Sequence, residues 1–540
     1  MDQAKDSVRT NAGRHGEALA LENAETGEKL TWRRFDDRVG ALAGHLRDRC
    51  GVGIGDRVLV LAEGDTRTFE VQFACIRLGA IMVPLNWRLA LPELIELAND
   101  VEPAVAILDG VWQDAGLKIA EAAGIRHRFG WRCGAGIEDY DAALAAATPA
   151  QPRTDLPMDL PTHILHTSGT TGRPKGAITT IKTLSWQTLN IGDWLLGPGY
   201  KQLNPMPLFH AGGLTTIATS MLMTGGAVLT MRRFEPDRVL ALLGDPAQGI
   251  THFTAPPVMW ASLSAQPGFA AADFGGIRHA QVAGGVPPRE LLELWSSRGV
   301  VLQQAYGGTE LGPAVSGMPR DAVAGRPASC GRAVPFTHVR LVTADGTDAA
   351  TGEVGEVWLK GPSVTPGYWR KDGTVDTART EDGWFRTGDA ARMDEDGFYY
   401  LVDRVKDMYK SGGENVAPTE VERVLITHPD VIDVAVVGIP DARWGEVGRA
   451  FVVARPGAVI TVEDLREYCS GRIARYKAPR SLVLVDDLPR NSTGKVSKPA
   501  LRAYGQGSLA ALAGQDADLL GGRGHRLSGA GQEVACGQAA

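Results

Sequence analysis

Apolar residues along the first 160 positions follow two different patterns. The stretch LTWRRFDDRVGALAGHLRDR has the spacing of an amphipathic helix, whereas RVLVLA and PAVAIL are short, continuous apolar runs. Helical stretches that alternate with such runs are typical of βαβ units around a largely parallel sheet. We therefore predict an α/β fold for this part of the chain.

The pattern changes twice further along. Apolar runs with glycine-rich corners continue through GGAVLTM, HAQVAGGVP and GVVLQQAYGGTE, and short strands and turns replace them from about Ser329, which predicts a small β-rich subdomain. After Arg404, two successive helix-then-strand segments indicate a small α+β domain, and the Gly/Ala-rich end has little periodicity. We predict a large amino-terminal domain over 1–403, a hinge over 404–406, a small mobile domain over 407–503, and a disordered tail over 504–540.

Composition and charge narrow the class of protein. A chain of 540 residues is too long for one hydrophobic core, and a net charge of −7 gives no reason to expect nucleic acid as a partner. The six cysteines are scattered without a C-x-x-C pair, so we expect buried thiols in a reducing compartment. Neither a secretory signal nor a long apolar run is recognisable. These features predict a cytoplasmic protein without a membrane span.

The segment HTSGTTGRPKG, residues 166–176, has the composition of a phosphate-binding loop. Glycines let backbone N–H groups approach an oxyanion, and the hydroxyls add further donors. The spacing differs from a Walker loop, in which lysine directly follows the second glycine and a hydroxyl residue follows the lysine. A kinase or P-loop ATPase is therefore disfavoured. The candidate phosphate-binding residues are Thr167, Ser168, Gly169, Thr170, Thr171, Gly172 and Lys175.

Six further motifs follow in the order PLFHAGG, AGGVPP, QQAYGGTE, WFRTGDAA, SGGENVAP and PRNSTGKVSKPALR. Together with TSGTTGRPKG, this series resembles the adenylate-forming superfamily, which includes acyl-CoA synthetases, coumarate-type ligases, luciferases and peptide-synthetase adenylation domains. The resemblance extends from about Leu30 to Arg502. It implies that the TSGTTGRPKG loop holds the β- and γ-phosphates of ATP.

The resemblance also implies roles in the large domain. Gly284, Gly285 and Tyr306 match the adenine site, where glycine backbone can lie flat against a purine and the tyrosine ring offers a stacking face. Thr309 matches the hydroxyl that contacts the α-phosphate, and Glu310 matches the carboxylate that binds Mg²⁺. Thr167 is a second candidate for the metal. His210 is expected to border the acyl pocket and not to act as a base.

The remaining candidates fall near and after the predicted hinge. Asp389 matches the carboxylate that contacts the ribose hydroxyls, and Arg404 matches an arginine on ribose or phosphate. Lys406 matches the hinge position, whereas Gly412 and Gly413 match a segment that lines the thiol channel after the small domain turns. Lys495 matches the adenylation lysine, which offsets the charge that builds as two anions meet. Lys498 is expected to be only a solvated neighbour.

The expected reaction has two steps and needs ATP, Mg²⁺ and coenzyme A. A carboxylate attacks the α-phosphorus, pyrophosphate leaves, and a thiol then takes the acyl group from AMP. An aromatic or hydroxycinnamic acid and a medium-chain fatty acid are both candidate substrates. Two other functions stay open, a stand-alone enzyme that loads a carrier protein and a non-catalytic member that binds nucleotide. The sequence leaves a homodimer open.

Overall fold

The computed structural model describes residues 5–167, 174–411, 414–490 and 495–504, except for the Pro313 side chain. The chain forms two compact units. One comprises Met1–Arg340, Trp358–Thr387 and Asp394–Tyr400, and the other comprises Leu341–Val357, Gly388–Met393 and Leu401–Ala540. The hinge and domain boundaries expected from the sequence stay a prediction.

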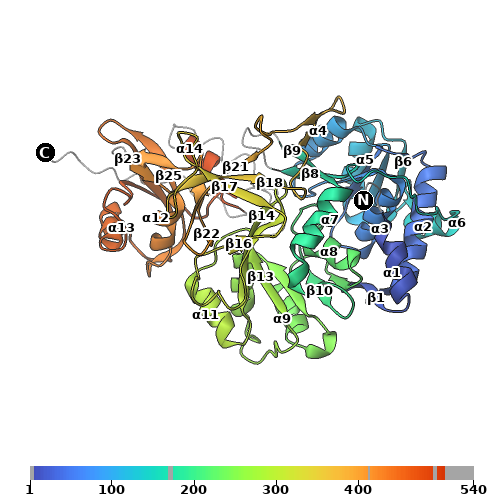
Figure 1. Ribbon diagram of the computed structural model, residues 1–540, viewed down its shortest axis with the longest axis horizontal. Helices are drawn as coiled ribbons and strands as arrows, with labels where there is room; N and C mark the ends of the chain where they lie inside the picture. The colour runs from blue at the N-terminus through green and yellow to red at the C-terminus, as the bar shows by residue number, and fades with distance from the viewer. Residues whose placement is uncertain (1–4, 168–173, 412–413, 491–494, 505–540) are drawn as a thin grey trace. The chain divides into compact units, whose positions relative to one another are not determined.

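The first unit contains two nine-stranded sheets (Figure 1). One has a parallel core with antiparallel strands at one edge. Its spatial order is β20 (Val375–Asp376), β19 (Tyr368–Trp369), β9 (Lys175–Thr180), β8 (Pro161–Thr167), β4 (Ile81–Pro84), β3 (Arg57–Leu61), β5 (Val105–Asp109), β6 (His127–Trp131) and β7 (Glu138–Asp139). The runs RVLVLA and PAVAIL lie in β3 and β5, which confirms their prediction as strands.

The second sheet also has a parallel core, over β14 to β1, with antiparallel strands at both edges. Its spatial order is β16 (Arg332–Ala333), β15 (Gly312–Gly317), β14 (Leu302–Gly308), β13 (His279–Ala283), β12 (His252–Ala255), β10 (Lys201–Asn204), β11 (Ala227–Thr230), β1 (Leu19–Asn23) and β2 (Lys29–Thr31). Because parallel strands end at the same edge, the loops after β10, β13 and β14 are brought to one side of this sheet.

Alternation along the strands explains how the helices cover both sheets. Val58 and Val60 of β3 belong to the core shared with the second sheet, whereas Leu59 and Leu61 face the opposite core. The shared core includes α1 (Ser7–His15), α2 (Trp32–Asp48), α3 (Thr66–Leu78) and α8 (Ile217–Met223). The outer faces are covered by α4 (Leu91–Val101) and α5 (Gln113–Ala122) on one sheet, and by α9 (Pro236–Leu243), α10 (Pro257–Ser264) and α11 (Arg289–Ser297) on the other.

Helix α2 shows why the amphipathic stretch begins where it does. The Thr31 side chain accepts a hydrogen bond from the Arg34 backbone N–H, which caps the first turn. The remaining helices of this unit are α6 (Tyr140–Ala146), α7 (Ile181–Asn190) and the short 3₁₀ turns Gly110–Trp112, Gly192–Trp194 and Pro246–Gln248.

The second unit contains a sheet of the order β24-β23-β26-β25, in which β27 also pairs with β26. These strands are β23 (Tyr409–Ser411), β24 (Glu414–Val416), β25 (Val431–Asp441), β26 (Gly445–Ala454) and β27 (Ser481–Leu484), and its helices are α12 (Pro418–Leu425), α13 (Val462–Cys469) and α14 (Lys498–Tyr504). A further sheet has the order β17 (His338–Val342), β18 (Gly355–Lys360), β21 (Phe385–Met393) and β22 (Tyr399–Arg404). The predicted α/β class and β-rich segment are confirmed.

The cysteines depart from expectation at one position. Cys50, Cys75, Cys330 and Cys469 are buried thiols, as predicted, but Cys133 is only half-buried because it follows the end of β6. Cys536 lies outside the described residues. No helix in the described part of the chain is long and apolar enough to cross a membrane.

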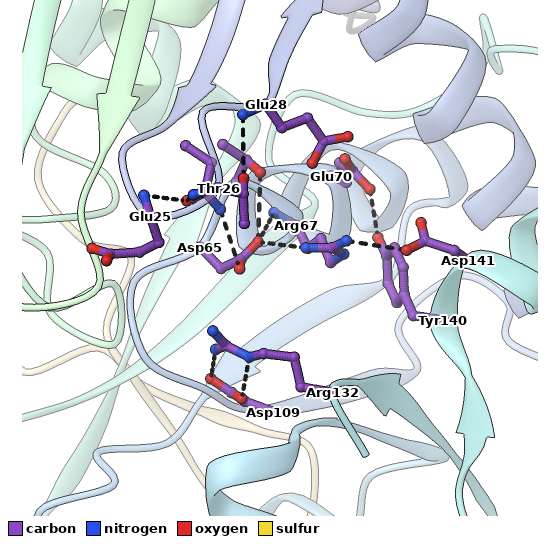
Figure 2. A network of polar contacts seen from close by, with 12 residues as sticks. Glu25, Thr26, Glu28, Asp65, Arg67, Glu70, Asp109, Arg132, Tyr140 and Asp141 are labelled. Atoms are coloured by element: carbon purple, nitrogen blue, oxygen red, sulfur yellow. Dashed lines mark hydrogen bonds and ion pairs between the residues drawn. The ribbon is translucent and has the colours of Figure 1, made fainter. Parts of the chain in front are cut away.

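A largely buried network of charged residues joins helices α2, α3 and α6, and Figure 2 shows its members from α3 and α6. Arg38 lies 2.7 Å from one oxygen of Glu70, which is 1% exposed, and the Tyr140 hydroxyl donates to the other oxygen at 2.8 Å. Arg67 lies 3.0 Å from Asp141. Burial, followed by the nearby Glu70 charge, raises the pKa of Tyr140 well above its usual value. The tyrosine therefore stays a neutral hydrogen-bond donor.

Replacement of Tyr140 with phenylalanine should lower the free energy of unfolding by about 1–3 kcal/mol, because the buried Glu70 carboxylate loses a donor. Chemical denaturation of the variant measures this loss. Tyr468→Phe is the matched control, since its hydroxyl donates to the Thr427 carbonyl at an exposed site and its loss should cost less than about 0.5 kcal/mol. Equal stability of the two variants would contradict a stabilising role for the buried network.

Candidate functional site

The predicted residues of the first unit gather at strand ends. Thr167 is the last residue of β8, Gly284 and Gly285 follow β13, and Thr309 and Glu310 form the turn between β14 and β15. Strands β13 and β14 are parallel neighbours, so their carboxyl ends lie side by side. Ligands of α/β proteins commonly bind in the crevice at this edge of a sheet.

Thr167 and Glu310 meet directly, although they come from different sheets. The Thr167 hydroxyl donates to Oε1 of Glu310 at 2.9 Å. The Tyr368 hydroxyl donates to the same oxygen at 3.2 Å, and the ammonium of Lys175 lies 4.9 Å from the centroid of the Tyr368 ring. Among the residues that the structure describes, none donates a hydrogen bond to Oε2 of Glu310. The carboxylate is thus held from one side by two hydroxyls.

Tyr368 is a residue of this cluster that the sequence analysis missed. It lies in the two-residue strand β19, which pairs with β9 through Ala177. The pairing carries Tyr368 to the strand that follows the TSGTTGRPKG loop. The GYW triplet around Tyr368 belongs to none of the seven motifs, so only the strand pairing reveals this contact.

The turn that carries Thr309 and Glu310 is fixed by its backbone. Gly312 has a φ of +79°, and a Cβ atom there would lie 3.2 Å from the Ser363 carbonyl oxygen. The Thr365 backbone N–H donates to the Glu310 carbonyl at 2.9 Å. A residue with a side chain at position 312 would be strained and would crowd the segment that supports this turn.

A recess with an empty volume of about 270 Å³, part of it open to solvent, lies beside this turn. It brings together helix α7, the loop after β10 and the turn between β14 and β15, represented by Gln187, Ala211 and Thr309. Most of its lining side chains are polar. The lining residues are Ile178, Thr179, Thr183, Gln187, Ala211, Thr215, Gly308, Thr309, Gly312, Ser363 and Thr365.

The other candidates in the first unit surround these strand ends. Gly284 has a φ of +81°, a conformation that favours glycine, and directly follows β13. Tyr306 lies within β14 and is 8% exposed. His210 lies in the loop after β10, and its Nδ1 accepts a hydrogen bond from the Gly212 backbone N–H at 3.3 Å. This hydrogen bond fixes the orientation of the His210 ring within the loop.

His166 precedes Thr167 in β8 and was not singled out from the sequence. Loss of hydration lowers the pKa of His166 to about 4. Among the described residues, none forms a hydrogen bond with its ring Nδ1. The ring is therefore neutral at physiological pH and contributes no positive charge beside the phosphate loop.

In the second unit, Asp389 and Arg404 are paired. Arg404 Nε lies 2.7 Å from Asp389 Oδ1, and the Val405 backbone N–H donates to the Gly388 carbonyl at 2.9 Å. Asp389, predicted to contact ribose, and Arg404, predicted to contact ribose or phosphate, thus form an ion pair. Lys406 and Lys495 are both exposed.

Lys498 corrects an expectation. The motif predicts a solvated neighbour of Lys495, but the Lys498 side chain is only 13% exposed. Its ammonium lies 3.1 Å from Glu422 and 3.8 Å from Asp403. The local pattern gave no sign of this because both carboxylates come from earlier segments of the chain.

A cluster of arginine side chains in the second unit surrounds Trp444. The guanidinium groups of Arg443 and Arg480 lie 5.4 Å and 4.6 Å from the centroid of its ring. Burial, followed by the positive charge of Arg466, lowers the pKa of Arg480. Closely spaced cations beside an aromatic face can bind an anion attached to a flat ring.

The remaining candidate residues predicted from the sequence lie outside the described part of the chain. These residues are Ser168, Gly169, Thr170, Thr171, Gly172, Gly412 and Gly413.

Comparisons with known proteins match nearly the whole chain. A family model described as AMP-binding enzyme matches residues 8–369, and one described as AMP-binding enzyme C-terminal domain matches residues 420–495. A feruloyl-CoA synthase from Amycolatopsis sp is 37% identical over 93% of this chain and 97% of its own length. An indoleacetate–CoA ligase from Aromatoleum aromaticum is 36% identical over 88% of this chain and 92% of its own.

Among solved structures, ATP-bound MatB from Rhodopseudomonas palustris superimposes with a TM-score of 0.83 at 29% identity, covering 94% of this chain and 99% of that one. The family expected from the order of the seven motifs is confirmed. The chain belongs to the AMP-binding enzyme family.

Proposed function

We propose that this ATP-dependent acid–CoA ligase activates an aromatic acid of the hydroxycinnamic type. The observation that carries the proposal is the polar recess beside Thr309. A medium-chain fatty acid is the alternative substrate. The similarity to a feruloyl-CoA synthase and to an indoleacetate–CoA ligase supports an aryl acid.

The lining of the recess favours a substrate with hydrogen-bonding groups. Hydroxyl or amide groups of Thr183, Gln187 and Thr215 are among its lining. The donor groups of Thr183, Gln187 and Thr215 already bond to backbone carbonyls within the protein. Their remaining lone pairs could accept hydrogen bonds from a ring that carries hydroxyl groups, which a plain alkyl chain cannot offer.

The residues around the recess have distinct tasks in the adenylation step. The substrate carboxylate attacks the α-phosphorus of ATP in line, a P–O bond forms to the acyl oxygen, and pyrophosphate departs. Thr309 donates its hydroxyl to an α-phosphate oxygen. Lys175 and the loop after Thr167 hold the departing β- and γ-phosphates.

The Glu310 cluster fits Mg²⁺, because a carboxylate and two hydroxyls are hard oxygen donors. Glu310 and Thr167 are the residues that would hold the cation, with Oε2 of Glu310 facing no donor among the described residues. When bound, the cation would neutralise charge on the phosphate oxygens as pyrophosphate leaves.

The second unit supplies the remaining groups. Asp389 accepts hydrogen bonds from the ribose hydroxyls, and the paired Arg404 orients that carboxylate. The positive charge of Lys495 offsets the negative charges of the carboxylate and the α-phosphate as they meet. The unit then turns at Lys406. In the turned state Gly412 and Gly413 line the thiol channel. The CoA thiolate attacks the acyl carbon and releases AMP.

We assign the phosphate-rich end of CoA to the cluster of Arg443, Arg480 and Trp444. The two guanidinium groups complement phosphate charge, and the Trp444 ring holds both of them close together. A carrier protein would present a phosphopantetheine thiol without that nucleotide end. Use of free CoA and use of a carrier are therefore distinguishable at this cluster.

We also propose that the protein is located in the cytoplasm and forms a homodimer. Buried thiols at Cys50, Cys75, Cys330 and Cys469 suit a reducing compartment. Sedimentation of the purified protein at several concentrations would separate a monomer from a dimer.

Pyrophosphate release should depend on the acid supplied. In a panel of short, medium-chain, long-chain and hydroxycinnamic acids, with ATP and Mg²⁺, we expect the highest kcat/KM for a hydroxycinnamic acid, by about tenfold or more over an alkyl acid of similar length. Release should be accompanied by thioester only when CoA is present.

Other results would redirect the assignment. A preference for a medium-chain acid would identify a medium-chain fatty acid as the substrate and exclude the aryl acid. Acyl-adenylate that accumulates without thioester in the presence of CoA would indicate a carrier protein as acceptor. ATP binding without pyrophosphate release for every acid would indicate a nucleotide-binding protein.

A further inference from the structure

Two carboxylates flank the predicted pivot at Lys406, and one helix contacts both. Asp403 lies 3.8 Å from the ammonium of Lys498, and Asp407 lies 2.7 Å from the guanidinium of Arg502. Lys498 and Arg502 are four residues apart in α14, so they project from the same face of that helix. We call residues 403–407 the hinge segment.

Further hydrogen bonds within the second unit hold the Asp403 side chain in place. The Asp403 side chain is 5% exposed and accepts hydrogen bonds from the Thr419 backbone N–H and hydroxyl, each at 2.8 Å. These bonds place Asp403 at the start of α12. Arg502 and Asp407 are 32% and 11% exposed, so this second pair is also partly shielded from water.

Lys498 lies between two carboxylates of different elements. Its second partner, Glu422, belongs to α12 and accepts a hydrogen bond from the Val436 backbone N–H of β25 at 2.8 Å. Burial raises the pKa of Glu422, and the Lys498 charge opposes that rise. Removal of the lysine charge would leave these two poorly hydrated carboxylates with Arg423 as the other cation near both of them.

We propose that Lys498 is a positioning residue, which ties the hinge segment to α14 and thereby fixes the position of Lys495 relative to the pivot. Lys495 lies three residues before Lys498, directly ahead of α14. The inference rests on the proposed roles of Lys495 and Lys406. Through Lys498 and α14, the pivot at Lys406 and the adenylation lysine move together.

The two half-reactions depend on this connection to different extents. Adenylation needs Lys495, whose place is set through α14. The glycines assigned to the thiol step follow β23, which the chain reaches from the hinge segment without passing through α14. Loosening of α14 should therefore impair adenylation more than thioester formation.

The test compares Lys498→Met, which removes the charge but keeps an unbranched side chain, with Lys498→Arg. We expect Lys498→Met to lower kcat for acid-dependent ATP–pyrophosphate exchange about tenfold, with KM for ATP changed less than about threefold. Thioester formation from supplied acyl-adenylate and CoA should fall less than about threefold. Lys498→Arg should restore most of the exchange activity.

Arg455→Met is the matched control for charge. Arg455 belongs to the same unit, is exposed and donates to the Pro429 carbonyl at 2.6 Å. It should leave both half-reactions at the wild-type rate. A double-mutant cycle of Lys498→Met with Asp403→Asn, which retains an acceptor for Thr419, should give a smaller combined loss than the product of the two single losses.

Hydrogen–deuterium exchange supplies a readout that needs no substrate. Backbone amides of 403–407 should exchange faster in Lys498→Met than in the wild type and in Arg455→Met. Unchanged exchange there, or equal losses in the two half-reactions, would overturn the positioning role. Wild-type protein without activity towards any acid, combined with faster exchange in the variant, would instead refute the proposed function and leave the connection to the hinge segment intact.

Discussion

Replacement of Lys495 with alanine is expected to lower the rate of acyl-adenylate formation by about two to three orders of magnitude. The ammonium is the positive group that we assign to the reacting carboxylate and α-phosphate, two anions that repel each other as they approach. Its loss leaves that repulsion unopposed at the transition state. Acid-dependent ATP–pyrophosphate exchange measures the effect.

The second half-reaction provides the internal control. With acyl-adenylate supplied, Lys495→Ala should form thioester from CoA at a rate within about threefold of the wild type, because the lysine has withdrawn at that stage. Lys118→Ala, at an exposed position of α5, removes the same charge without touching the site. Equal loss in both half-reactions would show that Lys495 stabilises the fold and does not act on the adenylation step alone.

The contrast between Thr167 and Tyr368 shows what the sequence could predict at this site. Thr167 and Glu310 belong to motifs with fixed spacing, and the structure brings the two together at 2.9 Å. Tyr368 reaches the same carboxylate only because β19 pairs with β9. A two-residue strand has no periodicity, so no local pattern could predict this contact.

Lys498 illustrates a second limit of sequence analysis. The motif around Lys495 contains both lysines, and spacing alone cannot distinguish a solvated ammonium from a buried one. The difference comes from Asp403 and Glu422, which approach from the end of β22 and from α12. Parallel strands, by contrast, were predictable, because their burial on both faces produces continuous apolar runs.

Glu310 has a testable role that differs from that of Lys495. Glutamine at position 310 keeps an acceptor oxygen for the Thr167 and Tyr368 hydroxyls but carries no charge. The local fold should therefore persist while attraction for a divalent cation is lost. We expect Glu310→Gln to lower kcat for pyrophosphate release by about 100-fold and to raise the Mg²⁺ concentration needed for half-maximal rate by about tenfold or more.

A titration of the rate with Mg²⁺ separates this role from a structural one. Glu290→Gln, at an exposed position of α11, serves as the matched control and should behave as the wild type. Tyr368→Phe keeps the carboxylate charge and removes one hydroxyl, so its Mg²⁺ requirement should shift less than that of Glu310→Gln. If Glu310→Gln lost activity with an unchanged Mg²⁺ requirement, the carboxylate would act by orienting the turn that carries Thr309, and the cation would have to be held by other residues.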